Sequence, residues 1–349
     1  MEYNVAIKDY LTTKGITEVG FCDTKSLDSY ADFIEKEHRE SEYNKGHATY
    51  LDHSFNHSLE EDLWYNPLFS FPSGKSIIVI FYPYQLALPK SISKQNQTSQ
   101  EFQALGVSKI SKAALFEDYH RSVNRQLEDL RNYIMVNYGK ESKAFCDEGP
   151  LNDKAIALKT GLLKVGRNSL LLHPHYGSRF YIGYLITELE CATPLEQTLT
   201  YTSYKDLWHP FCHKCGRCQA SCPSGAIEDF GHLTSQRCIA YLTQSKEWSI
   251  QYSNQEEGII TVIPEGVKPN LSNYVYGCDI CQIVCPLNGR SLDAYSYAPC
   301  VNEYVTVKDI ENLSNKDFKN IYGKTSAGWI GKKRFLRNLR WNDYVRKVE

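Results

Sequence analysis

The clearest chemical signal in this sequence is a group of cysteines, because eight of its twelve lie between Cys212 and Cys285. The stretch CHKCGRCQASCP, residues 212–223, spaces four of them two, two and three residues apart and ends in proline. This spacing is typical of [4Fe–4S] proteins, in which the first three thiolates hold one cluster and the fourth reaches another. The stretch therefore predicts two clusters and a second cysteine motif.

The second motif, CDICQIVCP at residues 278–286, supplies three of the four ligands of a full copy. Cys238, in SQRCIAYLTQ, is the predicted fourth ligand, set apart by an insertion of 39 residues. A longer loop costs only about 0.6 kcal/mol of closure free energy for each doubling of its length. Pairing the ligands as in two-cluster ferredoxins gives one cluster to Cys212, Cys215, Cys218 and Cys285 and the other to Cys222, Cys238, Cys278 and Cys281.

Zinc is the alternative metal, since CxxC pairs bind it too. Zinc sites use isolated ligands in pairs, whereas two CxxC motifs with exchanged fourth ligands favour paired iron–sulfur clusters. The remaining cysteines are expected to be ordinary buried or partly buried thiols; they are Cys22, Cys146, Cys191 and Cys300.

The composition is that of an ordinary globular protein, with 42% hydrophobic residues, 23% charged residues and a formal net charge of -2. The longest apolar runs are far shorter than the roughly 18 residues of a membrane span, and the first residues do not form a secretion signal. We therefore expect a cytoplasmic protein with reduced cysteines and no membrane contact.

A near-neutral chain binds a polyanion only through a local patch. Residues 323–347, here called the basic segment, offer one, because they hold eight Lys or Arg against one acidic residue, Asp343. The basic segment would suit phosphate contacts, whose affinity weakens as salt rises. The alternative is a solvated amphipathic end.

The elements that must position these groups alternate between helices and strands. Helical spacing is found in residues 1–15, 116–139 and 153–166, and strands are predicted in 16–23, 75–84 and 178–189, with a long surface loop over 86–111. The reading is an α/β layered domain over 1–191, a ferredoxin-like module over 205–290 and a C-terminal extension over 291–349. Neither a GxGxxG motif nor a Walker-type loop indicates a nucleotide site.

Three stretches together resemble epoxyqueuosine reductase; they are QRCIAYLTQ, YGCDICQIVCPLN and CDEGPLNDKAIALKTGLLKVGRNSLLLHPHYGSRFYIGYLITEL. The likeness extends through FEDYH to GKKRFLRN, although the family's usual GLGWIGKN-like run is here GLLKVGRN. The resemblance implies an α/β N-terminal domain that binds cobalamin, a ferredoxin-like module with two [4Fe–4S] clusters, and an oxidoreductase. It also implies reduction of epoxyqueuosine to queuosine in tRNA, with electrons from an external donor.

The same resemblance implies site residues. Asp147 of CDEGP matches the acid that supplies a proton, since burial beside a corrinoid favours a protonated carboxyl. The alternative role for Asp147 is to stabilise the N–H groups of the following helix. The residues that match corrinoid-pocket segments, or lie beside the second cluster, are Gly166, Asn168, Gly177, Ser178, Tyr276 and Gly277.

His120 of EDYH has two possible roles, a lower axial ligand of cobalt or, more often on a helix, a hydrogen-bonded structural residue. Two rival functions also stay open at this point. One is a related corrinoid reductase with another substrate, such as a reductive dehalogenase-like protein. The other is a non-catalytic electron carrier, which would contain no corrinoid.

Overall fold

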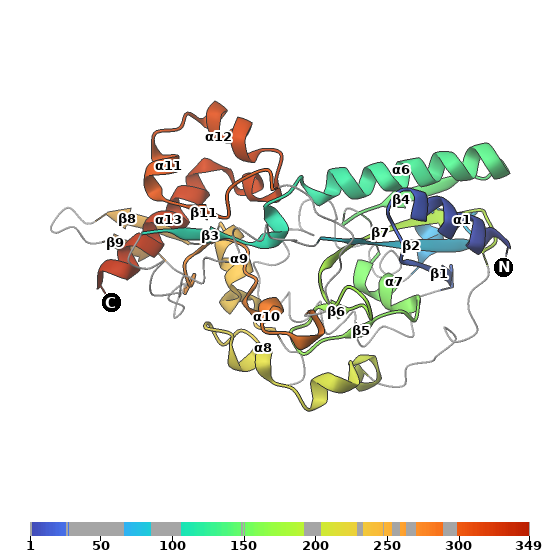
Figure 1. The fold of residues 1–349 in the computed structure, drawn as a ribbon, viewed down its shortest axis with the longest axis horizontal. Coiled ribbons are helices and arrows are strands. Elements are labelled where there is room, and N and C mark those ends of the chain that lie inside the picture. Colours follow the sequence, from blue (N-terminus) through green and yellow to red (C-terminus); the bar gives the residue numbers. More distant parts are fainter. Residues whose placement is uncertain are drawn as a thin grey trace.

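The computed structural model describes residues 2–25, 27, 66–84, 106–147, 149, 151–191, 204–228, 233–246, 248–252, 259–262, 270–288 and 299–348. Within these residues the chain forms two units, one built on a four-stranded sheet and one that carries the cysteine motifs and the C-terminus (Figure 1). The units lie side by side along the long axis of the molecule. Among the helices described, none is long and apolar enough to cross a membrane.

The four-stranded sheet has the order β1-β2-β7-β4, and all neighbouring strands are antiparallel. Its strands are β1 (Val19–Asp23), β2 (Ser76–Pro83), β4 (Ser142–Phe145) and β7 (Phe180–Thr187). Strand β2 is buried on both faces, because Ile77, Val79 and Phe81 enter one apolar cluster and Ile78 and Ile80 enter the other. The predicted strand over 75–84 is therefore confirmed as a central strand.

Helices cover both faces of this sheet, α1 (Glu2–Thr13) and α6 (Tyr119–Tyr138) on one side and α7 (Asp153–Lys159) on the other (Figure 1). The buried stripe of α6 recurs every three or four residues and includes Val123, Leu127, Leu130 and Ile134. This helix ends at Gly139, whose φ of 59° suits glycine. The predicted helices over 1–15 and 116–139 are confirmed, whereas α7 stops at Lys159 and residues 164–165 form a strand.

A second sheet has the order β10-β3-β11 and is formed by β3 (Ser108–Ile110), β10 (Tyr274–Tyr276) and β11 (Tyr304–Val305). Strand β3 runs parallel to β10 and antiparallel to β11, and its residues Ser108 and Ile110 are fully buried. The prediction of a surface loop over 86–111 is thus wrong at its C-terminal end, and residues 85–105 lie outside the described residues. Strand β3 is three residues long and its partner strands are distant in the sequence, so its local pattern is too short to predict a strand.

Short elements hold the cysteine motifs. They are η6 (Pro210–His213), α8 (Arg217–Ala220), η8 (Ser235–Arg237), α9 (Ile239–Gln244), α10 (Ile280–Ile283) and η9 (Pro286–Asn288). The other short elements are α4 (Pro67–Ser70), η3 (Lys112–Ala114), β5 (Lys164–Val165), β6 (Leu171–Leu172), η5 (Tyr204–Leu207), β8 (Ser249–Tyr252) and β9 (Ile259–Val262). Strands β5 and β6 pair with each other, as do β8 and β9.

The C-terminal segment folds onto the second sheet as α11 (Val307–Glu311), α12 (Asn315–Tyr322), η10 (Ser326–Ile330) and α13 (Gly331–Val348). Phe335 and Leu339 of α13 are buried in one apolar cluster with Ile110 of β3. Asn338, fully buried, donates to the carbonyl oxygens of Thr243 and Val275 at 2.7 and 2.8 Å. The solvated-end alternative therefore holds for only part of the basic segment, because one face of α13 is packed against the protein.

Candidate functional site

Four of the predicted cluster ligands line one pocket, and they are Cys212, Cys215, Cys218 and Cys285. The pocket is also lined by residues 166–168, Leu172, Phe211, Arg217, Pro286 and Leu287. Arg167 supports it by donating from Nε and Nη2 to the carbonyl oxygen of Cys212, at 3.3 and 3.1 Å. The structure thus brings together the ligands predicted for one cluster, although Cys285 comes from the second motif.

The other predicted ligands are Cys222, Cys238, Cys278 and Cys281, and their thiols influence one another. Burial, together with negative charge on Cys238, Cys218 and Cys222, raises the pKa of the Cys281 thiol to about 12. Burial also raises the pKa of Cys238, with a further contribution from charge on Cys222. Iron binds thiolates and compensates the charge that burial disfavours, so this donor set fits an iron–sulfur cluster.

The cysteines outside the motifs differ in exposure. Cys22, Cys146 and Cys191 are buried as expected, and burial raises the pKa of Cys22 to about 12. Cys300 is exposed, so the expectation of a buried or partly buried thiol is wrong for this residue. Cys300 lies after β10 and η9, in a segment whose sequence has no periodic pattern from which its burial or exposure could be predicted.

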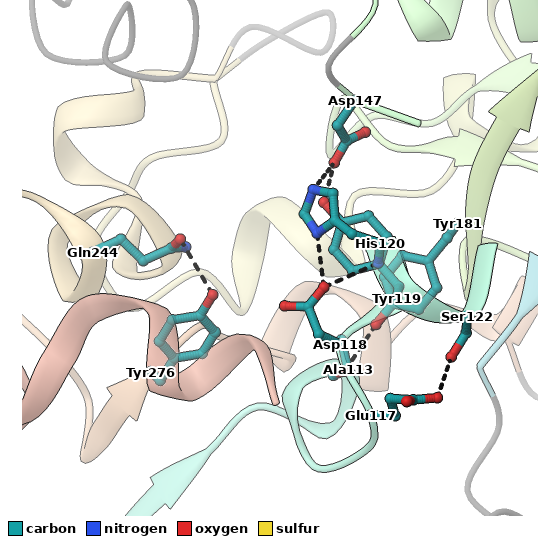
Figure 2. Close-up of polar contacts among 10 residues, drawn as sticks. All are labelled: Ala113, Glu117, Asp118, Tyr119, His120, Ser122, Asp147, Tyr181, Gln244 and Tyr276. Carbon is teal, nitrogen blue, oxygen red and sulfur yellow. Dashed lines mark hydrogen bonds and ion pairs between the residues drawn. The ribbon is translucent and has the colours of Figure 1, made fainter. Parts of the chain in front are cut away.

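Asp147 lies directly after β4 and meets the start of α6 (Figure 2). Its Oδ2 accepts a hydrogen bond from the Tyr119 hydroxyl and lies 3.6 Å from Nε2 of His120. The Asp147 side chain is 46% exposed, and its φ of 59° lies in the left-handed region. Gly149 is required nearby, because a Cβ there would lie 2.3 Å from the Tyr184 hydroxyl. The loop therefore presents a partly exposed carboxyl that two polar side chains hold.

Asp118 is the N-cap of α6 and also fixes His120. Its Oδ1 accepts from the His120 backbone N–H at 3.0 Å and lies 2.8 Å from the ring Nδ1. Burial acts to raise the pKa of Asp118, but the hydrogen bonds from His120 outweigh it and the pKa is lowered. An ionised Asp118 places the Nδ1 proton toward itself, so each ring nitrogen of His120 faces a carboxyl group. This arrangement does not support the cobalt-ligand alternative for His120.

A stack of tyrosines joins this group to the cluster-bearing unit. The Tyr119 ring stacks on Tyr181 at 4.2 Å and 6°, and Tyr181 lies 4.6 Å from Tyr84. The Tyr84 hydroxyl donates to Oε1 of Gln282, next to Cys281, at 3.0 Å. The position of Tyr119 is therefore set from both units.

Two of the predicted corrinoid contacts are packed against the cluster-bearing unit. Gly177 has a φ of 58°, and a Cβ there would lie 2.0 Å from Oδ1 of Asn288. The backbone N–H of Ser178 donates to the same oxygen at 2.7 Å. The need for glycine at 177 is thus explained by Asn288, and its predicted contact with a corrinoid stays a prediction.

The other predicted contacts have protein partners too. A Cβ on Gly166 would lie 2.8 Å from Oδ1 of Asn168, whose side chain hydrogen-bonds the Cys281 thiol. The N–H of Gly277 donates to Thr243 Oγ1 at 3.0 Å. Tyr276 donates to Gln244 Oε1 at 3.4 Å, and Figure 2 shows this pair opposite the Asp118, His120 and Asp147 group.

Sequence reasoning missed two members of the group. The sequence predicts a helix over 116–139 that contains Tyr119 and does not single out Asp118 as functional, although an aspartate before an apolar helical pattern is a known N-cap signal. Tyr119 and Asp147 are 28 positions apart in the sequence, so no local periodicity indicates the contact between them.

Glu18, His173 and His175 form another polar cluster, with ligand atoms within 4.8 Å of one another. His175 Nδ1 lies 2.6 Å from Glu18 Oε1, and His173 Nε2 lies 3.5 Å from Oε2. The N–H of His175 donates to Nδ1 of His173, so the neutral His173 ring carries its proton on Nε2, toward Glu18. A metal-bound His173 would need that proton on Nδ1, so the cluster is better explained by hydrogen bonds.

Many basic side chains of the basic segment donate hydrogen bonds to other parts of the protein. Arg337 donates to the carbonyl oxygens of Ser245 and Trp248 at 2.7 and 2.8 Å, and its guanidinium lies 3.7 Å from the Trp248 ring centre. Carbonyl oxygens also accept from Lys332, Arg334 and Arg346. Lys324 and Lys333 are exposed. Half of the eight basic side chains therefore dock α13 rather than face a partner.

Comparison with known proteins gives two family matches. Residues 65–148 match "Epoxyqueuosine reductase QueG, DUF1730", and residues 211–288 match "4Fe-4S double cluster binding domain". The second segment is therefore a domain that binds two [4Fe–4S] clusters. The mixed α/β fold with this domain in the C-terminal region agrees with the predicted fold class.

An epoxyqueuosine reductase of Staphylococcus aureus (strain NCTC 8325 / PS 47) is 30% identical over 339 residues, 95% of this chain and 77% of the relative. One of Bacillus cereus is 31% identical over 281 residues and 78% of this chain, which spans 64% of that relative's length. A crystal structure of epoxyqueuosine reductase with a tRNA-Tyr epoxyqueuosine-modified tRNA stem loop matches with a TM-score of 0.73 and 25% identity, over 98% of this chain and 80% of that one. The chain belongs to the epoxyqueuosine reductase family.

Proposed function

We propose that the protein reduces epoxyqueuosine to queuosine in tRNA. The observation that carries this proposal is the partly exposed Asp147 carboxyl, held by Tyr119 and His120 next to a domain that binds two [4Fe–4S] clusters. The reaction takes up two electrons and two protons and converts an epoxide into an alkene and water. It therefore needs an electron path and an acid at one place, and this site combines them.

Asp147 is the proposed proton donor to the departing epoxide oxygen. The Tyr119 hydroxyl donates to Oδ2 and fixes the direction of the carboxyl, and His120 lies near the same oxygen. Asp118, held ionised by its hydrogen bonds, keeps the imidazole in one orientation. A positioned acid of this kind typically contributes about 10²- to 10⁴-fold to a rate.

Cobalamin is the proposed second cofactor, on the strength of the family resemblance. The residues that face its proposed place are Tyr276 and Gln244 on one side and His120 and Asp147 on the other (Figure 2). The hydrogen-bond donors and acceptors of these side chains fit the polar edge of the macrocycle. The space beside Gly166 and Gly177, by contrast, is occupied by other atoms of the protein. When bound, cobalamin would supply a reduced cobalt that passes two electrons to the substrate.

The proposed partners are tRNA and an external electron donor, and the proposed location is the cytoplasm. The structural neighbour bound to a modified stem loop supports the tRNA assignment. On this chain the exposed Lys324 and Lys333 are the proposed phosphate contacts, and the carbonyl oxygen of Lys324 accepts from the Asp118 N–H at 2.8 Å. A phosphate near Lys324 would thus lie close to the acid group.

Anaerobic reconstitution with iron, sulfide and cobalamin, followed by metal analysis and turnover of epoxyqueuosine-containing tRNA, tests the proposal. We expect about eight irons and one cobalt per chain, and queuosine as product. Asp147→Asn should abolish turnover with both metals retained, while Asp129→Asn, at a partly exposed residue of α6 that pairs with Lys14, should leave it unchanged. Iron without cobalt would favour the electron-carrier alternative, and cobalt without turnover would favour a related reductase with another substrate.

A further inference from the structure

Asp153 occupies the first turn of α7 without acting as its cap. The cap is Asn152, whose Oδ1 accepts from the Ala155 N–H at 2.9 Å. Asp153 instead accepts from the backbone N–H of Asp147 through Oδ2, at 3.1 Å. Its other oxygen, Oδ1, is buried and has no hydrogen-bond partner among the described residues. The carboxyl therefore faces the acid loop, and helix capping does not explain it.

The surroundings of Asp153 hold negative and neutral groups. Asp147 reaches it from the loop after β4, and the buried Tyr184 hydroxyl faces it from β7. Lys154, the next residue, turns away and donates to the carbonyl oxygen of Ser169 at 3.3 Å. No Lys, Arg or His in the described part of the chain forms an ion pair with Asp153. Two carboxyls in such a place cannot both ionise cheaply.

The electrostatics agree with this geometry. Burial is the main cause that raises the pKa of Asp153 well above its usual range, and the charge of Asp147 and a side-chain hydrogen bond with it act in the same direction. Because Oδ1 of Asp153 is buried without a hydrogen-bond donor among the described residues, the protonated carboxyl is better accommodated there than a carboxylate. Burial and the charge of Asp153 likewise raise the pKa of Tyr184, so the tyrosine stays neutral.

We propose that Asp147 and Asp153 form an acid pair that shares one proton, in which Asp153 is the buried positioning residue that stores the proton and Asp147 is the exposed member that delivers it. The pairing rests on the contacts above, and its use in catalysis rests on the proposed function.

The proton balance of the pair is simple. The one shared proton rests on Asp153, passes to an Asp147 oxygen and is delivered from there to the departing oxygen. Both groups are then carboxylates, an unfavourable state that favours uptake of a new proton. The pair regains its proton from water through Asp147, whose side chain is 46% exposed. The pair titrates as a unit, and its apparent pKa values belong to both residues.

The direct test is infrared spectroscopy of the reconstituted protein near neutral pH, without substrate. Wild type should show the C=O stretch of a protonated carboxyl that Asp153→Asn lacks. Asp317→Asn is the matched control, because Asp317 also lies in the first turn of a helix but is exposed. In Asp147→Asn the band should persist and titrate away at lower pH, since the neighbouring charge is gone. A wild-type spectrum identical to that of Asp153→Asn would overturn the pair.

The pH profile of kcat/KM separates proton storage from a merely structural role. Asn at position 153 keeps an oxygen that can accept from the Asp147 N–H, but it holds no exchangeable acid proton. We expect the alkaline limb of the profile to move to lower pH by about one unit or more in Asp153→Asn. An unmoved limb in a folded, metal-loaded Asp153→Asn would refute storage. Failure of wild type to turn over the tRNA would count against the proposed function alone, because the infrared result does not depend on substrate.

Discussion

The ring Nδ1 of His120 lies 2.8 Å from Oδ1 of Asp118, and the same oxygen accepts the backbone N–H of His120 at 3.0 Å. One carboxyl therefore begins helix α6 and orients the imidazole beside Asp147. Helix stability and the geometry of the acid group depend on the same side chain, and substitutions can separate the two.

Asp118→Asn should leave the helix nearly intact, since asparagine is an equally good N-cap. Asp118→Ala should lower the free energy of unfolding by about 1 kcal/mol. Turnover should fall in both variants, because neither retains the negative charge that orients His120. Denaturant unfolding and steady-state kinetics would measure the two effects, and full activity in Asp118→Asn would contradict the role given to His120.

Tyr119→Phe keeps the stack on Tyr181 and removes the hydroxyl that donates to Asp147. A hydrogen bond to a charged group is worth about 1.5–3 kcal/mol, so kcat should fall roughly tenfold to a hundredfold. Tyr181→Phe is the matched control, since its hydroxyl donates to the Ala113 carbonyl oxygen instead. Equal losses in both variants would indicate a packing effect and not a specific contact with the acid.

Gly177→Ala should destabilise the protein by at least about 1 kcal/mol, because the backbone has a φ of 58° and a Cβ would strike Asn288. Gly216→Ala, where no other atom lies within 4 Å of the added Cβ, should be close to neutral. Thermal unfolding of cluster-loaded protein without cobalamin gives the comparison. If Gly177→Ala instead unfolds like wild type and only cobalt binding is lost, the glycine serves the cofactor.

His173 should make stability depend on pH. Burial, followed by the charge of His175, lowers the pKa of His173 to about 4 from an ordinary value of 6.5. Because the unfolded chain then binds more protons between these values, the stability is present above pH 6.5 and is lost as pH falls toward 4. The linked loss approaches about 3 kcal/mol. His173→Gln should flatten this slope in denaturant titrations, while His175→Gln, an exposed neighbour, should keep most of it.

Arg337→Met should lower the free energy of unfolding by about 2 kcal/mol, because carbonyl oxygens of Ser245 and Trp248 lose their donor. Lys333→Met should leave stability unchanged and weaken tRNA binding, with a smaller salt dependence. Binding assays at several salt concentrations, beside unfolding curves, distinguish the docking residue from the proposed phosphate contact. An unaltered salt slope in Lys333→Met would remove that residue from the interface.

The sequence predicts what local patterns encode. The spacing of the cysteines indicates two clusters, and β2 and α6 are marked by a continuous apolar run and a helical stripe. Asp147 as the acid comes from the resemblance and stays a prediction. The Tyr119 contact with Asp147 could not be predicted, because tertiary packing brings the two side chains together, whereas the Asp118 cap is local and its N-cap signal is visible in the sequence.

The basic segment shows the same limit. A count of charges cannot tell an arginine that binds phosphate from one that donates to main-chain carbonyls, as Arg337 does. Likewise, the three residues of β3 form a strand only because β10 and β11 pair with them.

The pairing of β3 has a consequence for the order in which the protein is made. Residues 108–110 leave the ribosome long before their partners at 274–276 and 304–305. The backbone that leads from β3 to Asp118 and His120 therefore gains its partner strands only after β10 and β11 have been synthesised. The strands of the four-stranded sheet all lie within residues 19–187 and can pair earlier, whereas the support under Asp118 and His120 is complete only when α13 has packed against β3.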